Sequence, residues 1–518
     1  MQVFRTILVI LTVTLGAGSA FAEVTLPAVF SDHMVLQHGQ AVYVWGWAGV
    51  GEKVTVSIAD RSSSTRAGSD GRWQVRLESL APGGPHVLTV RGANSLTVDD
   101  VLIGDVWLCS GQSNMAMTVS RAMNYQQEQA AANYPQIRHF KTASHAAPEP
   151  QDRCEGAWAV CSPDTVGAFT ATGYFFGREL HKQLDIPIGL INSSWGGTAV
   201  EAWTSWPAQE DLKPIKSLHK EWADKVAAYD LSKARAQLER NLETWKNRAE
   251  KAKAAGRKPP RKPTLAADPA VNQNRPANLF NGMIHPLIPY GIRGAIWYQG
   301  ERNTHGEISK SYGLQLETMI YDWRSRWGYE FPFAWVQLPN FTDLQTEPVE
   351  STGWVMVREG MLKTLDLSQT GMAITVDIGE AGDIHPKNKQ DVGHRLAKWA
   401  LTEVYGKPGV SSGPLYKSMA KKGGTIVVNF DNVGRSLVAK GDKLIGFAVA
   451  GADRKFVWAD AKIVGDTVVV SSPKVKSPAA VRYAWAPNPQ CNLYNSAGLP
   501  ASPFRTDNWS IELDANRR

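Results

Sequence analysis

A serine early in the chain has surroundings that suit acyl transfer. Ser113 lies in the stretch Ser110-Gly111-Gln112-Ser113-Asn114, directly after the apolar run Val106 to Cys109, and this pattern predicts a strand, a tight turn and then a helix. Free backbone N–H groups and the positive end of the helix dipole favour developing negative charge at such a position. Ser113 is therefore a candidate nucleophile, although a serine here could equally serve as a helix cap.

Three more loops place polar residues directly after strand-like runs. Because loops beyond the carboxyl ends of parallel strands gather at one edge of a sheet, we expect these loops and the Ser113 turn to surround one cleft. The loops and the runs before them are Ser193 to Thr198 after Ile188 to Asn192, Gln299 to Asn303 after Ala295 to Tyr298, and Gly379 to Pro386 after Ala373 to Asp377.

These loops supply the groups that a serine esterase requires, namely a base, a carboxylate that orients the base, and donors for the oxyanion. His385 is the expected base and Asp383 the expected carboxylate, with Asp377 and Asp391 as alternatives. Each group also has an ordinary explanation as a cap or a turn, and only their joint occurrence favours a catalytic site. The expected oxyanion donors are the backbone N–H of Ser113, an N–H of the Gly196-Gly197 pair and the side-chain amide of Asn303.

The elements that must position these residues follow from the pattern along the chain. Residues 101–408 alternate strand-like and helical runs, which predicts an α/β domain with a parallel sheet wrapped by helices. Residues 207–264 interrupt this alternation and predict one or two long exposed helices. Short β-branched and aromatic runs predict β domains over residues 23–100 and 409–518.

The N-terminal residues resemble a secretory signal. Arg5 followed by the apolar run Ile7 to Leu15 and by small residues at Ala20 and Ala22 predicts a secretory signal over residues 1–22, and no later run is long enough to span a membrane. We therefore expect a soluble, exported protein, periplasmic or extracellular.

The net charge of +7 comes from residues 210–263, which hold 15 Lys or Arg against 8 Asp or Glu, so nucleic acid is not an expected partner.

The cysteines predict neither a disulfide scaffold nor a zinc site. The chain has four, and neither a CxxC nor an HExxH spacing occurs, so we expect no metal. Cys154 and Cys161 lie close enough in sequence to form one short-range bridge in an oxidising compartment.

The motifs GQSNM, NSSWGGTAVEAW, WYQGERN and DIHP resemble conserved blocks of the SGNH hydrolases, in the form found in sialate O-acetylesterases and related carbohydrate esterases. The similarity extends over nearly the whole mature chain, from VTLPAVFSDHMVLQ to GLPASPFRTD. It implies a flavodoxin-like three-layer α/β/α domain with a helical insertion, accessory β domains at both ends, and removal of O-acetyl groups from sugars without a cofactor.

The resemblance assigns roles to particular positions. Ser113 corresponds to the nucleophile, His385 to the base, and Gly196 or Gly197 with Asn303 to the oxyanion contributors. The wider class places Asp three residues before the His, whereas Asp383 is two before it, as is common in the carbohydrate-esterase branch. Arg302 fills a position usually taken by a smaller residue, so it contacts either substrate or a neighbouring carboxylate. The residues expected to contact substrate are Gln112, Trp195, Gln299, Glu301 and Arg302.

The leading hypothesis is a carbohydrate O-acetylesterase that acts through an acyl-serine on an acetylated carbohydrate. An acetylesterase of plant cell-wall xylan or xyloglucan is the main alternative. An SGNH lipase or thioesterase is disfavoured because no long apolar stretch flanks the site, and a sugar-binding protein with a vestigial site is disfavoured by the complete Ser, Asn, Asp and His set. The oligomeric state is left open.

Overall fold

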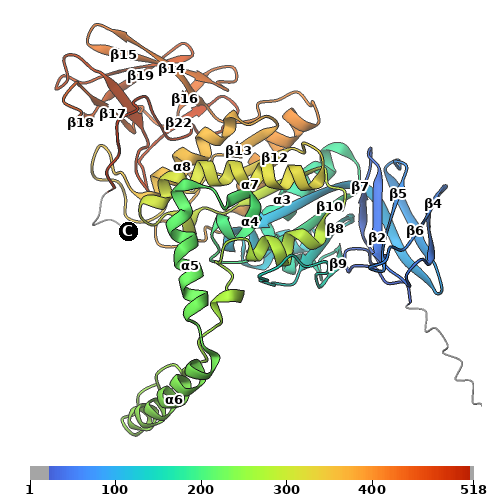
Figure 1. Ribbon diagram of the computed structural model, residues 1–518. Helices are drawn as coiled ribbons and strands as arrows, with labels where there is room; N and C mark the ends of the chain where they lie inside the picture. The colour runs from blue at the N-terminus through green and yellow to red at the C-terminus, as the bar shows by residue number, and fades with distance from the viewer. Residues whose placement is uncertain (1–22, 514–518) are drawn as a thin grey trace, which may run out of the picture.

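A computed structural model of the chain describes residues 23–513, so the predicted signal segment 1–22 lies outside the described residues. Its central feature is a sheet with the strand order β13-β12-β11-β7-β10-β8-β9 (Figure 1). All neighbouring pairs are parallel except β8 and β9. The strands are β7 (Ser95–Gly111), β8 (Tyr134–Thr142), β9 (Gly156–Cys161), β10 (Ile188–Ser194), β11 (Gly294–Tyr298), β12 (Phe333–Val336) and β13 (Thr370–Ala373).

Helices pack on both faces of this sheet, as expected for parallel strands that are buried on both sides. Alternate residues of β7 illustrate this, because Val106 and Leu108 belong to the apolar cluster that includes α7, whereas Trp107 and Cys109 belong to the cluster that includes α3 and α9. The helices outside the insertion are α1 (Ser113–Ala116), α2 (Tyr125–Ala130), α3 (Ala171–Leu184), α7 (Tyr312–Trp327), α8 (Gly353–Lys363) and α9 (Lys389–Trp399).

Strand β7 joins the N-terminal strands to the central sheet. Its first half pairs with β6 and β1, and its second half pairs with β10 and β11. The expected domain boundary at residue 100 therefore falls inside one continuous strand that ends at the Ser113 turn. The N-terminal strands are β1 (Val35–Gln37), β2 (Val42–Trp47), β3 (Lys53–Ile58), β4 (Arg61–Arg66), β5 (Arg72–Leu77) and β6 (Gly83–Arg91).

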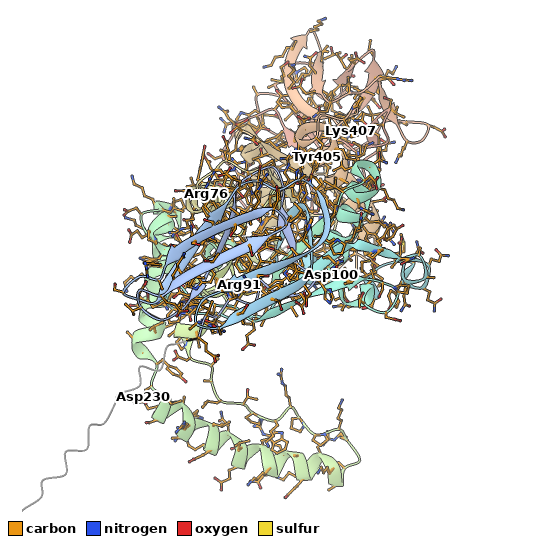
Figure 2. The ribbon with its side chains drawn as sticks, turned by 90° about the vertical axis from the view of Figure 1, so that its right-hand side faces the viewer. Arg76, Arg91, Asp100, Asp230, Tyr405 and Lys407 are labelled. Atoms are coloured by element: carbon orange, nitrogen blue, oxygen red, sulfur yellow. The ribbon has the colours of Figure 1, made fainter. Side chains whose placement is uncertain are left out.

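The expected insertion forms an arm that projects from the rest of the chain (Figures 1 and 2). It contains α5 (Lys216–Ala228) and α6 (Leu231–Ala254), whereas α4 (Trp206–Gln209) precedes it and packs near α7. Asp230 caps α6 by accepting from the backbone N–H groups of Ser232 and Lys233. The segment after α6 returns along it, because the indole N–H of Trp245 donates to the carbonyl of Pro260.

The C-terminal strands have an apolar core of their own and contact α8 and the segments that follow β12 and β13. Arg358 of α8 is buried and donates to the carbonyls of Ala486 and Pro487, which links the two parts. The strands are β14 (Leu415–Lys422), β15 (Thr425–Asp431), β16 (Leu437–Ala439), β17 (Phe447–Ala450), β18 (Phe456–Trp458), β19 (Asp460–Val464), β20 (Thr467–Ser471), β21 (Ala480–Tyr483), β22 (Leu493–Asn495) and β23 (Phe504–Arg505).

Two expectations need correction. All four cysteines are free thiols, so the Cys154–Cys161 bridge is not formed. Strand β9 occupies most of the interval between the two residues and, at ~3.3 Å per residue, spans roughly 16 Å, whereas bridged Cα atoms lie within about 7 Å. The strand expected over residues 373–377 is β13, which ends at Ala373, and the chain continues from there as a buried loop.

Between residues 23 and 513, no helix has both the length and the apolar character that crossing a lipid bilayer demands.

Candidate active site

Ser113 begins helix α1 directly after β7, at the edge of the central sheet. The turn before it requires glycine, because Gly111 has φ +135° and a Cβ there would lie 2.2 Å from the carbonyl oxygen of Tyr298 in β11. The backbone N–H of Gln112 also donates to that carbonyl at 2.9 Å. The neighbouring strand thus holds the turn that presents the Ser113 hydroxyl.

His385 approaches Ser113 from the loop after β13, three strands away in the sheet. Its Nε2 lies 2.8 Å from the Ser113 Oγ, so a neutral imidazole that carries its proton on Nδ1 can accept the hydroxyl proton. Burial lowers the pKa of His385 below its ordinary value of 6.5, and the Asp383 charge opposes this shift. The histidine is therefore largely neutral, as a base must be, at neutral pH.

Asp383 lies beside His385 but holds it loosely. Its Oδ1 accepts from the backbone N–H of His385 at 2.9 Å and is 3.6 Å from the ring Nδ1, beyond hydrogen-bond distance, and the side chain is 43% exposed. The hydrogen bond from that N–H lowers the pKa of Asp383. The two alternatives are engaged elsewhere, because Asp377 pairs with Arg395 and Asp391 accepts from Asn388.

The loop after β10 lies against the nucleophile. A Cβ at Gly196 would lie 3.3 Å from the Cβ of Ser113, so a glycine permits this close approach. The backbone N–H of Trp195 donates to the carbonyl of Gly111 and joins the loop to the end of β7. Gly197 is exposed, with φ +72°, and its Cβ would not approach Ser113. Of the two glycines, Gly196 is the one beside the serine.

The Asn303 side chain connects the loops after β10 and β11. Its Oδ1 accepts from the backbone N–H of Val200 and from Gln299, and its Nδ2 donates to the carboxylate of Glu201 at 2.9 Å. An amide nitrogen carries two hydrogens, and among residues 23–513 the structure records a partner for one of them. Asn303 is therefore rigidly oriented while one donor remains available.

A buried polar network lies beneath Ser113. Gln112 and Asn114, on either side of the serine, both donate to the carboxylate of Glu301, and Asn114 also donates to the carbonyl of Ile384 at 3.0 Å. Lys389 donates to the Asn114 Oδ1 at 2.9 Å. Burial raises the pKa of Glu301 and lowers the pKa of Lys389 to about 7. This network joins three of the four loops.

Three of the residues that we expected to contact substrate are instead buried beneath the loops. Gln112 and Glu301 are 3% and 5% exposed and bond to each other, and Gln299 is completely buried with bonds to Thr198 and Asn303. Their polar atoms support the loops from within because burial without such partners would be costly. Trp195 is half-buried and Arg302 is exposed, so these two remain open to a ligand.

Sequence reasoning did not identify Asn114 and Lys389 of this network, nor Glu201, which accepts from Asn303. Each lies within or beside a motif that carried the resemblance: GQSNM, GGTAVEAW and the segment after DIHP. For Glu201 the available signal was a carboxylate inside an apolar run, whereas Asn114 and Lys389 lie among other polar residues. The partners of all three come from other loops and cannot be read from one stretch of sequence.

The chain matches a known protein family over two segments. Residues 103–236 and 274–402 match the profile of a family described as carbohydrate esterase, sialic acid-specific acetylesterase, and these segments include all the catalytic candidates. The intervening residues 237–273 contain most of α6.

Curated relatives and a solved structure extend over almost the whole chain. The rat sialate O-acetylesterase is 29% identical over 544 aligned positions, covering 96% of each chain, and the human sialate O-acetylesterase is 31% identical, covering 94% of this chain and 92% of the human protein. A carbohydrate acetylesterase from Xanthomonas citri, solved by crystallography, is 38% identical with a TM-score of 0.79, covering 94% of this chain and 100% of that one.

Proposed function

Because this chain belongs to the sialic acid-specific acetylesterase family of carbohydrate esterases, we propose that it is an exported serine O-acetylesterase that removes acetyl groups from sugars through an acyl-serine intermediate. Membership of this family makes the chain a carboxylic ester hydrolase. The observation that carries the mechanism is the 2.8 Å contact between the Ser113 Oγ and the His385 Nε2.

In the first half of the reaction, His385 takes the hydroxyl proton as the Ser113 Oγ attacks the acetyl carbonyl. The carbonyl oxygen becomes an oxyanion, which the backbone N–H of Ser113, an N–H of the Gly196-Gly197 pair and the free Asn303 N–H stabilise. When the intermediate collapses, the C–O bond to the sugar breaks and the protonated His385 gives its proton to the sugar oxygen. The deacetylated sugar leaves, and the acetyl group stays on Ser113.

In the second half, water takes the place of the sugar. Neutral His385 accepts a proton from the water as its oxygen attacks the acetyl-serine carbonyl, and the same donors stabilise the second oxyanion. Collapse breaks the bond to the Ser113 Oγ, which recovers its proton from His385, and acetate leaves. The loop that carries the imidazole orients it, and the charge of Asp383 stabilises its protonated form.

The substrate class is tested by acetate release from defined acetylated sialosides and from acetylated xylan and xyloglucan oligosaccharides. The resemblance to sialate O-acetylesterases supports sialosides. The Xanthomonas citri relative, which is more similar in sequence, is described as a carbohydrate acetylesterase without a named sugar, so the panel also includes neutral polysaccharides. Acetate release from at least one class, lost in Ser113→Ala, is the expected result. Release from none of them would overturn the proposal.

Acyl-chain selectivity separates the acetylesterase from a lipase or thioesterase. We place Trp195 and the Gly196 backbone beside the acyl group, because the Trp195 N–H donates to the Gly111 carbonyl and a Cβ at Gly196 would lie 3.3 Å from the Cβ of Ser113. We expect kcat/KM for aryl esters to fall steadily from acetyl to butyryl and longer chains. A rise with chain length would favour the lipase alternative.

A further inference from the structure

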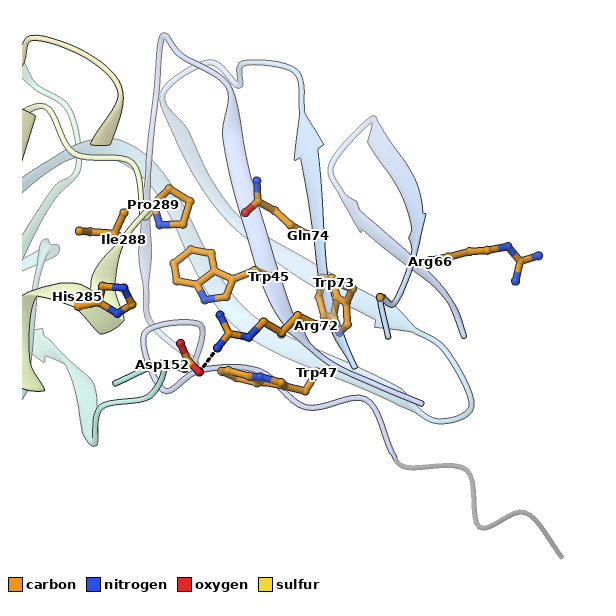
Figure 3. Close-up of a pocket in the computed structure, with 12 residues that line it drawn as sticks. Trp45, Trp47, Arg66, Arg72, Trp73, Gln74, Asp152, His285, Ile288 and Pro289 are labelled. Carbon is orange, nitrogen blue, oxygen red and sulfur yellow. Dashed lines mark hydrogen bonds and ion pairs between the residues drawn. The ribbon is translucent and has the colours of Figure 1, made fainter. Parts of the chain in front are cut away.

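A cavity lies between the N-terminal strands and the part of the chain that holds His285 (Figure 3). Its volume is about 500 Å³, within the range of small-molecule sites, and none of the catalytic candidates lines it. Figure 3 shows Trp45, Trp47 and Arg72 projecting from the strands toward Asp152, His285 and Pro289. Sites at the junction of two structural units commonly bind ligands.

The register of strands β2 and β5 gives one face of this ribbon an unusual composition. β2 alternates buried Val42, Val44 and Gly46 with half-exposed aromatic residues, and β5 exposes polar residues. The solvated face of an antiparallel pair is normally polar on both strands. Here a row of aromatic rings lies beside a row of planar hydrogen-bonding groups, in the cross-strand pairs Tyr43 with Arg76, Trp45 with Gln74, and Trp47 with Arg72.

The polar groups around the two indoles are held in place. Arg72 forms an ion pair with Asp152, and the Arg153 guanidinium lies 3.6 Å from the ring centroid of Trp47. The cavity therefore combines aromatic surface with a fixed charge pair.

We propose that this cavity is a second, non-catalytic binding site for carbohydrate. Apolar C–H faces of a pyranose ring stack on Trp45, and its hydroxyls bond to Arg72, Gln74 and Asp152, which offer both donors and acceptors. The site holds part of a glycan chain apart from the acetyl group under attack. Its assignment to a glycan rests on the proposed function, but its test is a binding measurement with unacetylated sugars, which esterase activity does not affect.

The experiment is calorimetric titration of the full chain with xylohexaose and, separately, with 3′-sialyllactose. These probes share pyranose rings but differ in charge, so they distinguish a neutral polysaccharide from a sialylated glycan. We expect one of them to bind with a Kd of about 1 mM or tighter. Trp45→Ala should weaken binding at least ~10-fold through the lost stacking surface, and Gln74→Ala should weaken it less.

Trp458→Ala is the matched control, because Trp458 is an exposed tryptophan on β18 that is 43% accessible. Melting temperature and aryl acetate turnover of each variant report whether the chain is folded. If Trp45→Ala does not fold, Gln74→Ala, an exposed position, decides alone. Binding of neither probe by the wild type, or equal binding by the Trp45 or Gln74 variant and the Trp458 variant, would overturn the proposal.

A second inference comes from the network under Ser113 and is independent of the cavity. The backbone carbonyls on both sides of His385 are bonded to one buried pair, since Asn114 donates to the carbonyl of Ile384 and Lys389 donates to that of Pro386. Lys389 also donates to the side chain of Asn114, and both residues are completely buried. Asn114 follows Ser113 directly, so this pair joins the nucleophile to the base.

We infer that Asn114 and Lys389 are positioning residues that set the distance between the Ser113 Oγ and the His385 ring. The contact from Asp383 to the His385 ring is longer than a hydrogen bond and half-exposed, so it does not position the imidazole tightly. The bonds at Ile384 and Pro386 instead fix the backbone from which the imidazole projects. Neither residue needs to touch the substrate to act in this way.

The test is a double-mutant cycle between Lys389→Met and His385→Ala, assayed with an aryl acetate. Lys389→Met alone should lower kcat by roughly 10- to 100-fold with little change in KM, since a displaced base is a less effective base. In the His385→Ala background it should lower the residual kcat by less than about 2-fold, because the group it positions is gone. Asn114→Ala should behave in the same way.

Arg324→Met is the matched control. Arg324 is also a buried cation that donates to backbone carbonyls, those of Phe331, Ser368 and Gln369, but it lies away from the site loops. It should lower the melting temperature as much as Lys389→Met does while leaving kcat nearly unchanged. If Lys389→Met lowers kcat by the same factor with and without His385, or if the Arg324 control lowers kcat equally, the positioning role is overturned. Should Lys389→Met not fold, the same cycle with Asn114→Ala decides.

Discussion

The Asn303 amide nitrogen lies 2.9 Å from the Glu201 carboxylate, and both side chains are buried. The carboxylate orients the amide from behind, and burial raises the pKa of Glu201. Because the second N–H of the amide strengthens its bond only as the substrate oxygen becomes charged, Asn303→Ala should lower kcat by roughly 10²- to 10³-fold with little change in KM. Both constants are measured on an aryl acetate beside the melting temperature. An unchanged kcat would remove Asn303 from the catalytic set.

Replacing Glu201 tests whether that orientation matters. In Glu201→Gln the side-chain oxygen can still accept from Asn303, so kcat should fall by less than about 10-fold, whereas Glu201→Ala should approach the loss of Asn303→Ala. Activities are compared with those of the Asn303 variants. Equal, small losses in both Glu201 variants would mean that Val200 and Gln299 hold the amide without the carboxylate.

Ser113→Ala should lower kcat on aryl acetates by roughly 10⁴-fold or more, because the variant lacks the nucleophilic hydroxyl. The fold should remain intact, since alanine suits the first position of α1. A fluorophosphonate reagent should label Ser113 in the wild type, as peptide mass spectrometry would show. Labelling of another serine, or near-normal activity of the variant, would contradict the assignment.

Asp383→Asn should lower kcat less than the same change does in a triad whose aspartate is buried and hydrogen-bonded to the histidine ring, where kcat typically falls about 10⁴-fold. The Asp383 carboxylate is 43% exposed and 3.6 Å from the ring, so solvent screens its effect on the imidazole. We expect a fall in kcat of roughly 10- to 100-fold. Kinetics of this variant beside His385→Ala give the comparison, and equal losses in the two would show that the aspartate bonds the ring more closely during turnover.

The pH profile should reflect the lowered pKa of His385. Only the neutral imidazole accepts the Ser113 proton, so kcat/KM should rise with pH and reach half its plateau below pH 6.5. Asp383→Asn removes a charge that raises this pKa and should move the midpoint lower, whereas Lys389→Met removes a charge that lowers it and should move the midpoint higher. The pH profiles of the wild type, Asp383→Asn and Lys389→Met are measured on an aryl acetate. Identical midpoints would mean that the loss of activity at low pH does not come from protonation of His385.

Replacing Arg302 tests whether the substrate carries a carboxylate. It is exposed beside the buried Asn303 and is free to meet a carboxylate on the substrate. If the substrate is an acetylated sialoside, Arg302→Ala should raise its KM by roughly 10-fold through the lost charge-assisted bond. The KM for an acetylated xylo-oligosaccharide should not change, and Arg302→Lys should restore part of the difference. Equal effects on both substrates would exclude carboxylate recognition by Arg302.

Local patterns determined the elements and the reactive side chains. The strand-like runs over residues 188–192 and 295–298 are confirmed as β10 and β11, whose bounds differ from the expected ones by at most two residues, because apolar runs and turn residues are local properties. The turn before Ser113 was recognisable for the same reason, since a strand, a glycine and a helix start are adjacent in sequence.

The tertiary structure alone decided which side chains meet. Ser113 and His385 are 272 residues apart, and their contact depends on a loop that crosses from β13 over two strands to β7. The same is true of Gln112 and Glu301, which sequence reasoning assigned to substrate and the fold turns inward to each other. A polar residue in a motif has the same chemistry whether it faces a cleft or a neighbouring loop, and only the packing of those loops determines which of the two it serves.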